Sequence, residues 1–154
     1  MNPYPILLDT NLLVLFVVGT ASREYIAKHK RLTQFIAKDY DTLIEMISRA
    51  PSVLVTPNTL TETSNLAAHI AEPARSEVFR VLRSVIATSR ETYVPSHTAA
   101  ERGEFIKLGL TDAALIEASS QEVAVVTTDL NLYLATLAKG TPAVNFNHLR
   151  DQYL

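Results

Sequence analysis

The chain contains no cysteine, and only four of its 154 residues are glycine. Without cysteine there is no disulfide bond, no zinc–thiolate site and no cysteine nucleophile. No internal repeat, low-complexity tract or Gly/Ser-rich linker divides the sequence. Its length is that of one ordinary domain, so we expect residues 1–154 to form a single domain.

Charged residues are also scarce. They make up 19 % of the chain, against roughly 25 % in typical soluble domains, whereas hydrophobic residues make up 47 %. The net charge of −2 argues mildly against nucleic-acid binding, which favours a basic surface. Basic residues nevertheless gather in two groups, which form either solvated helix faces or contacts to a polyanion. The groups are Arg23, Lys28, Lys30 and Arg31, and Arg75, Arg80, Arg83 and Arg90.

The apolar stretch from Ile6 to Val18 is interrupted by Asp9 and Asn11, and no Lys or Arg precedes it. A signal peptide needs a basic start and an uncharged core, and a membrane span needs about 20 apolar residues. We interpret the stretch as a buried strand that leads into a buried helix. The sequence therefore predicts a soluble, cytoplasmic protein with no membrane partner.

Short apolar runs alternate with helical patterns along the chain. This alternation predicts an α/β fold, with a central parallel sheet of four to five short strands and helices on both faces. In such sheets, ligands gather beyond the carboxyl ends of the strands. The expected strands are residues 4–8, 52–56, 123–127 and 142–146. The expected helices are 11–18 ended by Gly19, 22–50 with a break near Asp39–Asp41, one beginning at Pro57, 73–89, one capped by Thr111 that runs to about Gln121, and 130–138. Residues 98–107 are expected to form a short helix or a helical turn.

Four acidic residues stand at the ends of these elements. Asp9 and Asp129 follow strands, Asp112 opens a helix, and Glu62 lies in the helix that begins at Pro57. Gathered together, such carboxylates would repel: one pair about 4 Å apart costs about 4 kcal/mol at an effective dielectric of 20. A divalent cation would turn that repulsion into binding. Because the donors are all oxygen atoms, they favour Mg²⁺ or Mn²⁺, the ions that serve phosphodiester cleavage in two-metal sites.

Each acid also has an ordinary structural explanation. Asp9 and Asp129 are suited to cap the helices that follow them. Asp112 complements the dipole of its helix, and Glu62 fits a solvated helix surface. The four together, in these positions, favour a functional site over four separate structural roles.

The sequence resembles the PIN domain family of metal-dependent ribonucleases over nearly its whole length. Four segments carry the resemblance, and as an ordered set they are more specific than any one alone. They are ILLDTNLLV (6–14) with Asp9 and Asn11, TLTETSN (59–65) with Glu62, LTDAALIEAS (110–119) with Asp112, and VVTTDLNLY (125–133) with Thr127 and Asp129.

The resemblance implies a PIN-like three-layer sandwich and an endoribonuclease that hydrolyses phosphodiester bonds of single-stranded or structured RNA by a two-metal type of mechanism. Its cofactor would be Mg²⁺ or Mn²⁺. We hypothesise that Asp9, Asp112 and Asp129 ligate the metal and that Glu62 completes the shell or holds a water. Asn11 and Thr127 would orient these ligands from behind.

Three basic residues are weaker candidates for holding the RNA backbone, namely Lys28, Arg31 and Arg83. Many PIN domains are toxins of toxin–antitoxin pairs and others mature ribosomal RNA, so an antitoxin protein is one candidate partner. The length of the 20–50 region and the sequence pI near 6.1 fit the toxin class poorly. The low charged fraction and the habit of the family both predict a homodimer.

Three other interpretations compete. A haloacid-dehalogenase-type phosphatase needs a second Asp two residues after the first, where this chain has Asn11. A response-regulator receiver needs an acidic pair before its phosphorylated Asp and a Lys after its last strand, and neither is present. A PIN-like module that binds RNA or protein without nuclease activity remains open, although the chain keeps every acid of the four motifs.

Overall fold

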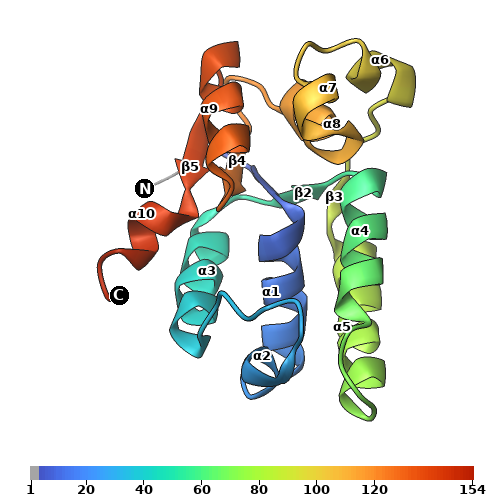
Figure 1. Cartoon of the computed structure of the whole chain (residues 1–154), viewed down its shortest axis with the longest axis vertical. Helices are drawn as coiled ribbons and strands as arrows, with labels where there is room; N and C mark the ends of the chain where they lie inside the picture. The colour runs from blue at the N-terminus through green and yellow to red at the C-terminus, as the bar shows by residue number, and fades with distance from the viewer. Residues whose placement is uncertain (1–3) are drawn as a thin grey trace.

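A computed structural model describes residues 4–154, and a five-stranded sheet separates two layers of helices in it (Figure 1). The strand order is β3-β2-β1-β4-β5, and every pairing is parallel. This confirms the predicted α/β class and three-layer arrangement. The strands are β1 (Ile6–Leu8), β2 (Val53–Val55), β3 (Arg90–Glu91), β4 (Ala124–Thr127) and β5 (Ala143–Asn145).

Helices connect consecutive strands. Before β3 they are α1 (Thr10–Ala21), α2 (Tyr25–Lys28), α3 (Ala37–Arg49), α4 (Pro57–Ala67) and α5 (Ala74–Thr88). After β3 they are α6 (Ser96–Ala100), α7 (Phe105–Leu108), α8 (Leu110–Ala118), α9 (Leu130–Lys139) and α10 (Phe146–Arg150). None of these helices combines the length and apolar character that a membrane crossing requires, within residues 4–154.

Alternation along β1 divides the core between the two layers. Ile6 and Leu8 pack into a large cluster with residues of α1, α3, α4 and α5. Leu7 points the other way, into a cluster that includes Leu115 of α8 and Leu132 of α9. Successive side chains of a strand face opposite sides of a sheet, and both faces of β1 are buried. This central strand therefore requires a continuous run of apolar residues.

The connections change sides between β1 and β4. Helices α1, α3, α4 and α5 lie on the face of Ile6 and Leu8, whereas α8 and α9 lie on the face of Leu7. The chain leaves β1 toward one layer and leaves β4 toward the other, although the two strands are neighbours. Such a switch point opens a crevice at the carboxyl edge, where ligands of open α/β sheets bind. The order also differs from the 2-1-3-4-5 order of receiver-type sheets, which argues against the response-regulator alternative.

Two expected helix ends were wrong for steric and tertiary reasons. Gly19 does not end the first helix, because α1 continues to Ala21. Its missing side chain instead admits the ring of Tyr40, with which a Cβ would overlap. Thr111 does not cap its helix either. Gly109 stands before α8 at φ +88°, a backbone conformation that favours glycine, and the Thr111 hydroxyl points elsewhere.

The expected long helix over 22–50 is divided earlier than predicted. Residues 29–36 separate α2 from α3, and the buried His29 ring anchors them by hydrogen bonding to the Ala67 carbonyl at 3.1 Å and the Arg31 amide at 3.1 Å. Asp39 lies in the first turn of α3 instead of breaking the helix, and its carboxylate accepts the Ile36 amide at 2.8 Å. Likewise, the helix expected over 98–107 is two short helices, α6 and α7, and the two-residue edge strand β3 was not predicted.

Candidate functional site

Asp9 occupies the junction of β1 and α1. The register pairs Leu8 with Val126, so the next residues along, Asp9 and Thr127, lie side by side at the carboxyl edge. The Asp9 carboxylate accepts a hydrogen bond from the Thr127 hydroxyl and another from the Leu12 amide at 3.1 Å. Asp9 therefore caps α1, which is the structural role expected for it from the sequence. The residue is also 95 % buried against the neighbouring strand.

Asp129 follows β4 by two residues and begins α9. Its carboxylate accepts the amides of Asn131 at 2.8 Å and Leu132 at 3.2 Å. Its own amide donates to the Thr127 hydroxyl at 2.9 Å. Because Thr127 also donates to Asp9, one hydroxyl links the two acids that leave the adjacent strands. The resemblance predicts an orienting role for Thr127, and its hydroxyl contacts both acids.

Asp112 lies in the first turn of α8, and Gly109 directs the chain into that turn. The Asp112 side chain is partly buried and accepts no hydrogen bond from residues 4–154. Burial is the main cause that raises its pKa from 3.8 to about 7, followed by the charges of Asp129, Asp9 and Glu62 in that order. The other three acids of the motif set are therefore near enough to act electrostatically on Asp112.

Glu62 approaches the other acids from α4. This helix follows β2, which pairs with β1 on the side opposite β4. Its carboxylate accepts hydrogen bonds from the hydroxyls of Thr10, at 3.3 Å, and Thr111. Thr10 is the first residue of α1 and Thr111 the second of α8. Neither threonine was among the site residues expected from the sequence. Asn11, which was, is exposed in the first turn of α1 and its side chain has no hydrogen bond within residues 4–154.

We name Asp9, Glu62, Asp112 and Asp129 the acid cluster. No Lys, Arg or His forms an ion pair with any of them in the part of the chain that the structure describes. Burial also raises the pKa of Asp9, although hydrogen bonds from Thr127 and from two backbone amides oppose that rise. Within the described residues, the acids of the cluster therefore lie near one another without a basic side chain to offset their charge.

The side chains of the cluster do not yet enclose an ion. Across residues 4–154, no three His, Asp or Glu side chains stand in an arrangement that would hold a metal. Each acid except Asp112 is instead engaged by hydroxyl or amide donors. Cation binding would therefore require a different arrangement of these side chains.

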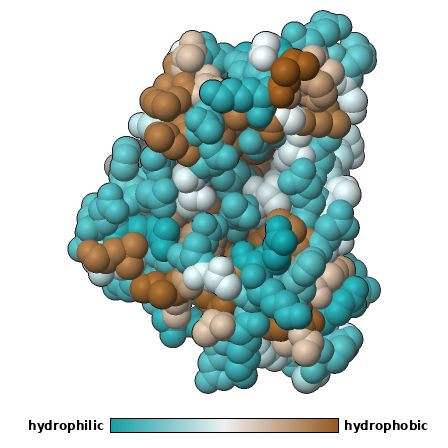
Figure 2. Space-filling model, in the orientation of Figure 1, coloured by the Kyte–Doolittle hydropathy of each residue, from teal (hydrophilic) through white to brown (hydrophobic). Residues whose placement is uncertain are grey.

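An open groove of about 650 Å³ lies between α7 and α9, and the four acids of the cluster are not among the residues that line it. Asn131, whose amide donates to the Asp129 carboxylate, lies on its wall and connects it to the cluster, and Leu108, Leu134 and Lys107 also line it. Lys107 is exposed and has no acidic partner within the described residues. Figure 2 shows hydrophobic surface over α9 and over the α6–α7 segment, with hydrophilic surface between them. On α9 this apolar surface consists of exposed leucines, namely Leu130, Leu134 and Leu137.

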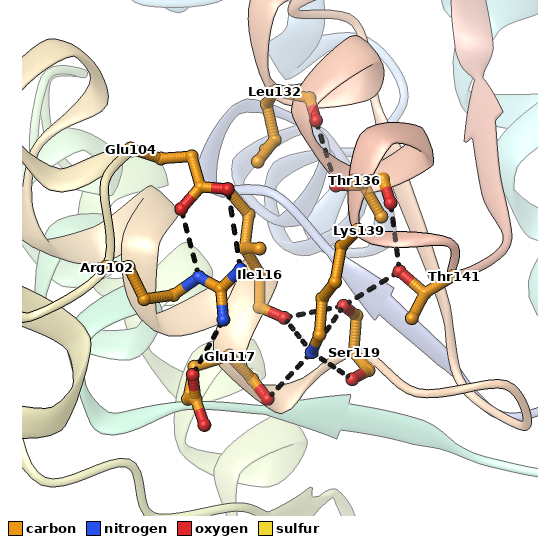
Figure 3. A network of polar contacts seen from close by, with 9 residues as sticks. All are labelled: Arg102, Glu104, Ile116, Glu117, Ser119, Leu132, Thr136, Lys139 and Thr141. Atoms are coloured by element: carbon orange, nitrogen blue, oxygen red, sulfur yellow. Dashed lines mark hydrogen bonds and ion pairs between the residues drawn. The ribbon is translucent and has the colours of Figure 1, made fainter.

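Behind the groove, polar contacts join the carboxyl-terminal ends of α8 and α9 (Figure 3). The Lys139 ammonium donates to the carbonyls of Ile116 at 2.6 Å and Ser119 at 2.7 Å. Arg102 bonds Glu104 at 3.0 Å and Glu117 at 2.9 Å. Because the last carbonyls of a helix lack partners within it, Lys139 satisfies those of α8 and fixes that helix against α9. The helices that carry Asp112 and Asp129 are thereby tied together.

The basic residues expected to hold RNA lie elsewhere. Lys28 belongs to α2, which sits at the opposite end of α1 from Asp9 (Figure 1). Arg31 lies in the segment that follows α2, and Arg83 is exposed on α5. The structure therefore does not bring these three side chains to the acid cluster, whereas it does place Lys107 in the groove between α7 and α9.

Comparison of the chain with known protein families, with curated proteins and with solved structures found no match.

Proposed function

We propose that this protein is a metal-dependent endoribonuclease with Mg²⁺ or Mn²⁺ as cofactor, as its resemblance to PIN domains implies. One observation carries the proposal: the four motif acids, which are far apart in sequence, meet at the switch point of the sheet without a cationic partner among the described residues. Four carboxylates kept together at an unfavourable electrostatic cost are hard to explain by stability alone, since caps and surface positions need no such meeting.

The donor set fits the proposed cofactor. All four side chains offer hard oxygen ligands, and no cysteine exists in the chain to select a softer metal. Asp9, Asp112 and Asp129 would hold the ion, with Glu62 beside them. When bound, such an ion supplies an acidified water and neutralises charge that develops on the phosphate.

The residues of the chain itself would prepare the site. Thr127 keeps Asp9 directed toward Asp129, and the amides at the start of α9 fix Asp129. The groove between α7 and α9 would accept the RNA strand on one side of the scissile phosphate, with Lys107 in reach of a backbone phosphate. Its apolar wall suits the faces of unstacked bases, which single-stranded RNA exposes.

The test is the Asp9→Asn variant, compared with Asp151→Asn as a matched control. Asparagine keeps an oxygen that can accept from Thr127 and Leu12 but removes the charge. Asp151 is exposed, and its side chain has no hydrogen bond or ion pair within residues 4–154. With end-labelled single-stranded RNA and Mn²⁺, we expect Asp9→Asn to cut at least about 100-fold more slowly, with unchanged circular dichroism, and Asp151→Asn to cut like the wild type. Equal rates for both variants would refute the proposal.

One observation favours the alternative, a PIN-like module that binds RNA or protein without cutting. Among the described residues, no three acidic side chains stand in an arrangement that would hold a metal, and both Asp9 and Asp129 have roles as helix caps. Calorimetric titration separates the two functions. A nuclease of this type binds Mn²⁺ with an affinity that Asp112→Asn weakens, whereas a module without the chemistry shows no saturable Mn²⁺ binding.

A further inference from the structure

Glu62 is the only member of the acid cluster that receives hydroxyl hydrogen bonds on both of its carboxylate oxygens, within residues 4–154. Thr10 donates to Oε1 at 3.3 Å and Thr111 donates to Oε2. A glutamate on an exposed helix surface ordinarily samples several rotamers, and ordering it costs side-chain entropy. Here the two hydroxyls form a clamp that restricts the carboxylate from both sides.

The clamp residues are chain neighbours of other cluster members. Thr10 directly follows Asp9, and Thr111 directly precedes Asp112. Holding Glu62 to these two hydroxyls therefore also fixes its position relative to both aspartates. The clamp joins the two layers as well, because α1 and α4 lie on one face of the sheet and α8 lies on the other. No other side-chain hydrogen bond within residues 4–154 connects α4 to α8.

We propose that Thr10 and Thr111 are positioning residues, whose hydroxyls hold Glu62 in place for the divalent cation of the cluster. This rests on the proposed function, in that it takes the acid cluster as the cation site. The threonines touch neither the cation nor the RNA. They act through Glu62, and outer partners of this kind typically change metal affinity by 10- to 100-fold when they are removed.

Substitutions of threonine can separate the role of its hydroxyl from that of its methyl group. Thr111→Val and Thr10→Val keep the branched shape and remove the donor, whereas Thr111→Ser keeps the donor and removes the methyl group. Thr61→Val is the matched control, since Thr61 is exposed on α4 next to Glu62 and its side chain has no hydrogen bond within residues 4–154.

Two measurements without RNA test the clamp. Scalar couplings across the Glu62 Cα–Cβ bond, measured by NMR on the metal-free protein, should report one rotamer in the wild type. They should report averaged rotamers in the variant that carries both valines. Calorimetric titration with Mn²⁺ should show an affinity about tenfold weaker for Thr111→Val and weaker still for the double variant. Thr111→Ser and Thr61→Val should bind within about threefold of the wild type.

The outcomes separate the clamp from the proposed function. Wild-type Mn²⁺ affinity in both valine variants would overturn the clamp and leave the nuclease standing. An equal loss in Thr111→Ser and Thr111→Val would also overturn it, because packing and not the hydroxyl would then be responsible. Hydroxyl-dependent Mn²⁺ binding in a protein that cuts no RNA would support the clamp and refute the nuclease. A wild-type protein that binds no Mn²⁺ would overturn both.

Discussion

Removing the charge of Asp112 should stabilise the metal-free protein. The pKa of this carboxyl group rises from 3.8 to about 7 in the folded state. Between these values the folded protein holds a proton that the unfolded chain has lost, so unfolding becomes easier as the pH rises. The stability associated with Asp112 is therefore fully present below pH 3.8 and is lost as the pH rises through about 7.

The magnitude follows from the same shift. At about 1.4 kcal/mol per pKa unit, the ionised side chain opposes folding by about 4 kcal/mol. Solvent reaches part of Asp112, and screening reduces this cost to about 2 kcal/mol. Asp112→Asn removes the charge and sacrifices no hydrogen bond within residues 4–154. For a chain of this length, the gain corresponds to a Tm increase of roughly 4–8 °C.

The assay is thermal unfolding in EDTA at pH 5 and pH 8, for the wild type, Asp112→Asn and the control Asp151→Asn. At pH 8 we expect the free energy of unfolding of Asp112→Asn to exceed that of the wild type by about 2 kcal/mol. At pH 5 the difference should be smaller. Some pH dependence should remain in the variant, since the pKa of Asp9 is also raised by burial. A variant at or below wild-type stability at pH 8 would show that Asp112 carries no unfavourable charge, and the electrostatic argument for the cluster would fail.

Three further predictions concern the cation, the groove and the core. Mn²⁺ at about 100 times its Kd should stabilise the wild type by about 2.7 kcal/mol in thermal unfolding; no stabilisation would contradict cation binding. Lys107→Ala should weaken RNA binding measured by fluorescence anisotropy, and the slope of log affinity against log salt concentration should become shallower by about 0.7. Lys28→Ala, at the far end of α1, should change neither quantity. Equal effects of the two variants would argue against RNA binding in the groove. Gly19→Ala should destabilise the protein by about 1–3 kcal/mol in urea, because its Cβ meets the ring of Tyr40; an unchanged midpoint would show that the ring yields freely.

The layered fold and the meeting of the acids could be predicted from local patterns. Apolar runs at β1 and β4 mark strands buried on both faces, and parallel strands end at a common edge, so acids directly after them must emerge together. Asp9 and Asp129 are such residues. The edge strand β3 gave no such signal, because its two residues, Arg90 and Glu91, are charged and exposed. Edge strands commonly carry charge, since it discourages pairing with other chains.

Other features depend on contacts that sequence spacing does not contain. Thr111 looks like a helix cap within its own segment, but its hydroxyl reaches Glu62, 49 residues away. Lys28 and Arg31 look like a polyanion-binding group, but α1 carries the chain away from the carboxyl edge before they occur. A cluster of charges can be recognised within a short stretch of sequence. Its distance from a site, however, depends on the direction of the helices that lie between them. Lys107 belongs to neither basic group of the sequence, so charge patterning does not single it out.

Diffraction from crystals grown with Mn²⁺, collected where manganese scatters anomalously, tests the central claim most directly. The account predicts an anomalous peak within about 2.5 Å of carboxylate oxygens of Asp9, Asp112 and Asp129, with Glu62 adjoining it. Crystals that contain Mn²⁺ and show no peak at the acid cluster, or a peak only at other surface carboxylates, would contradict it.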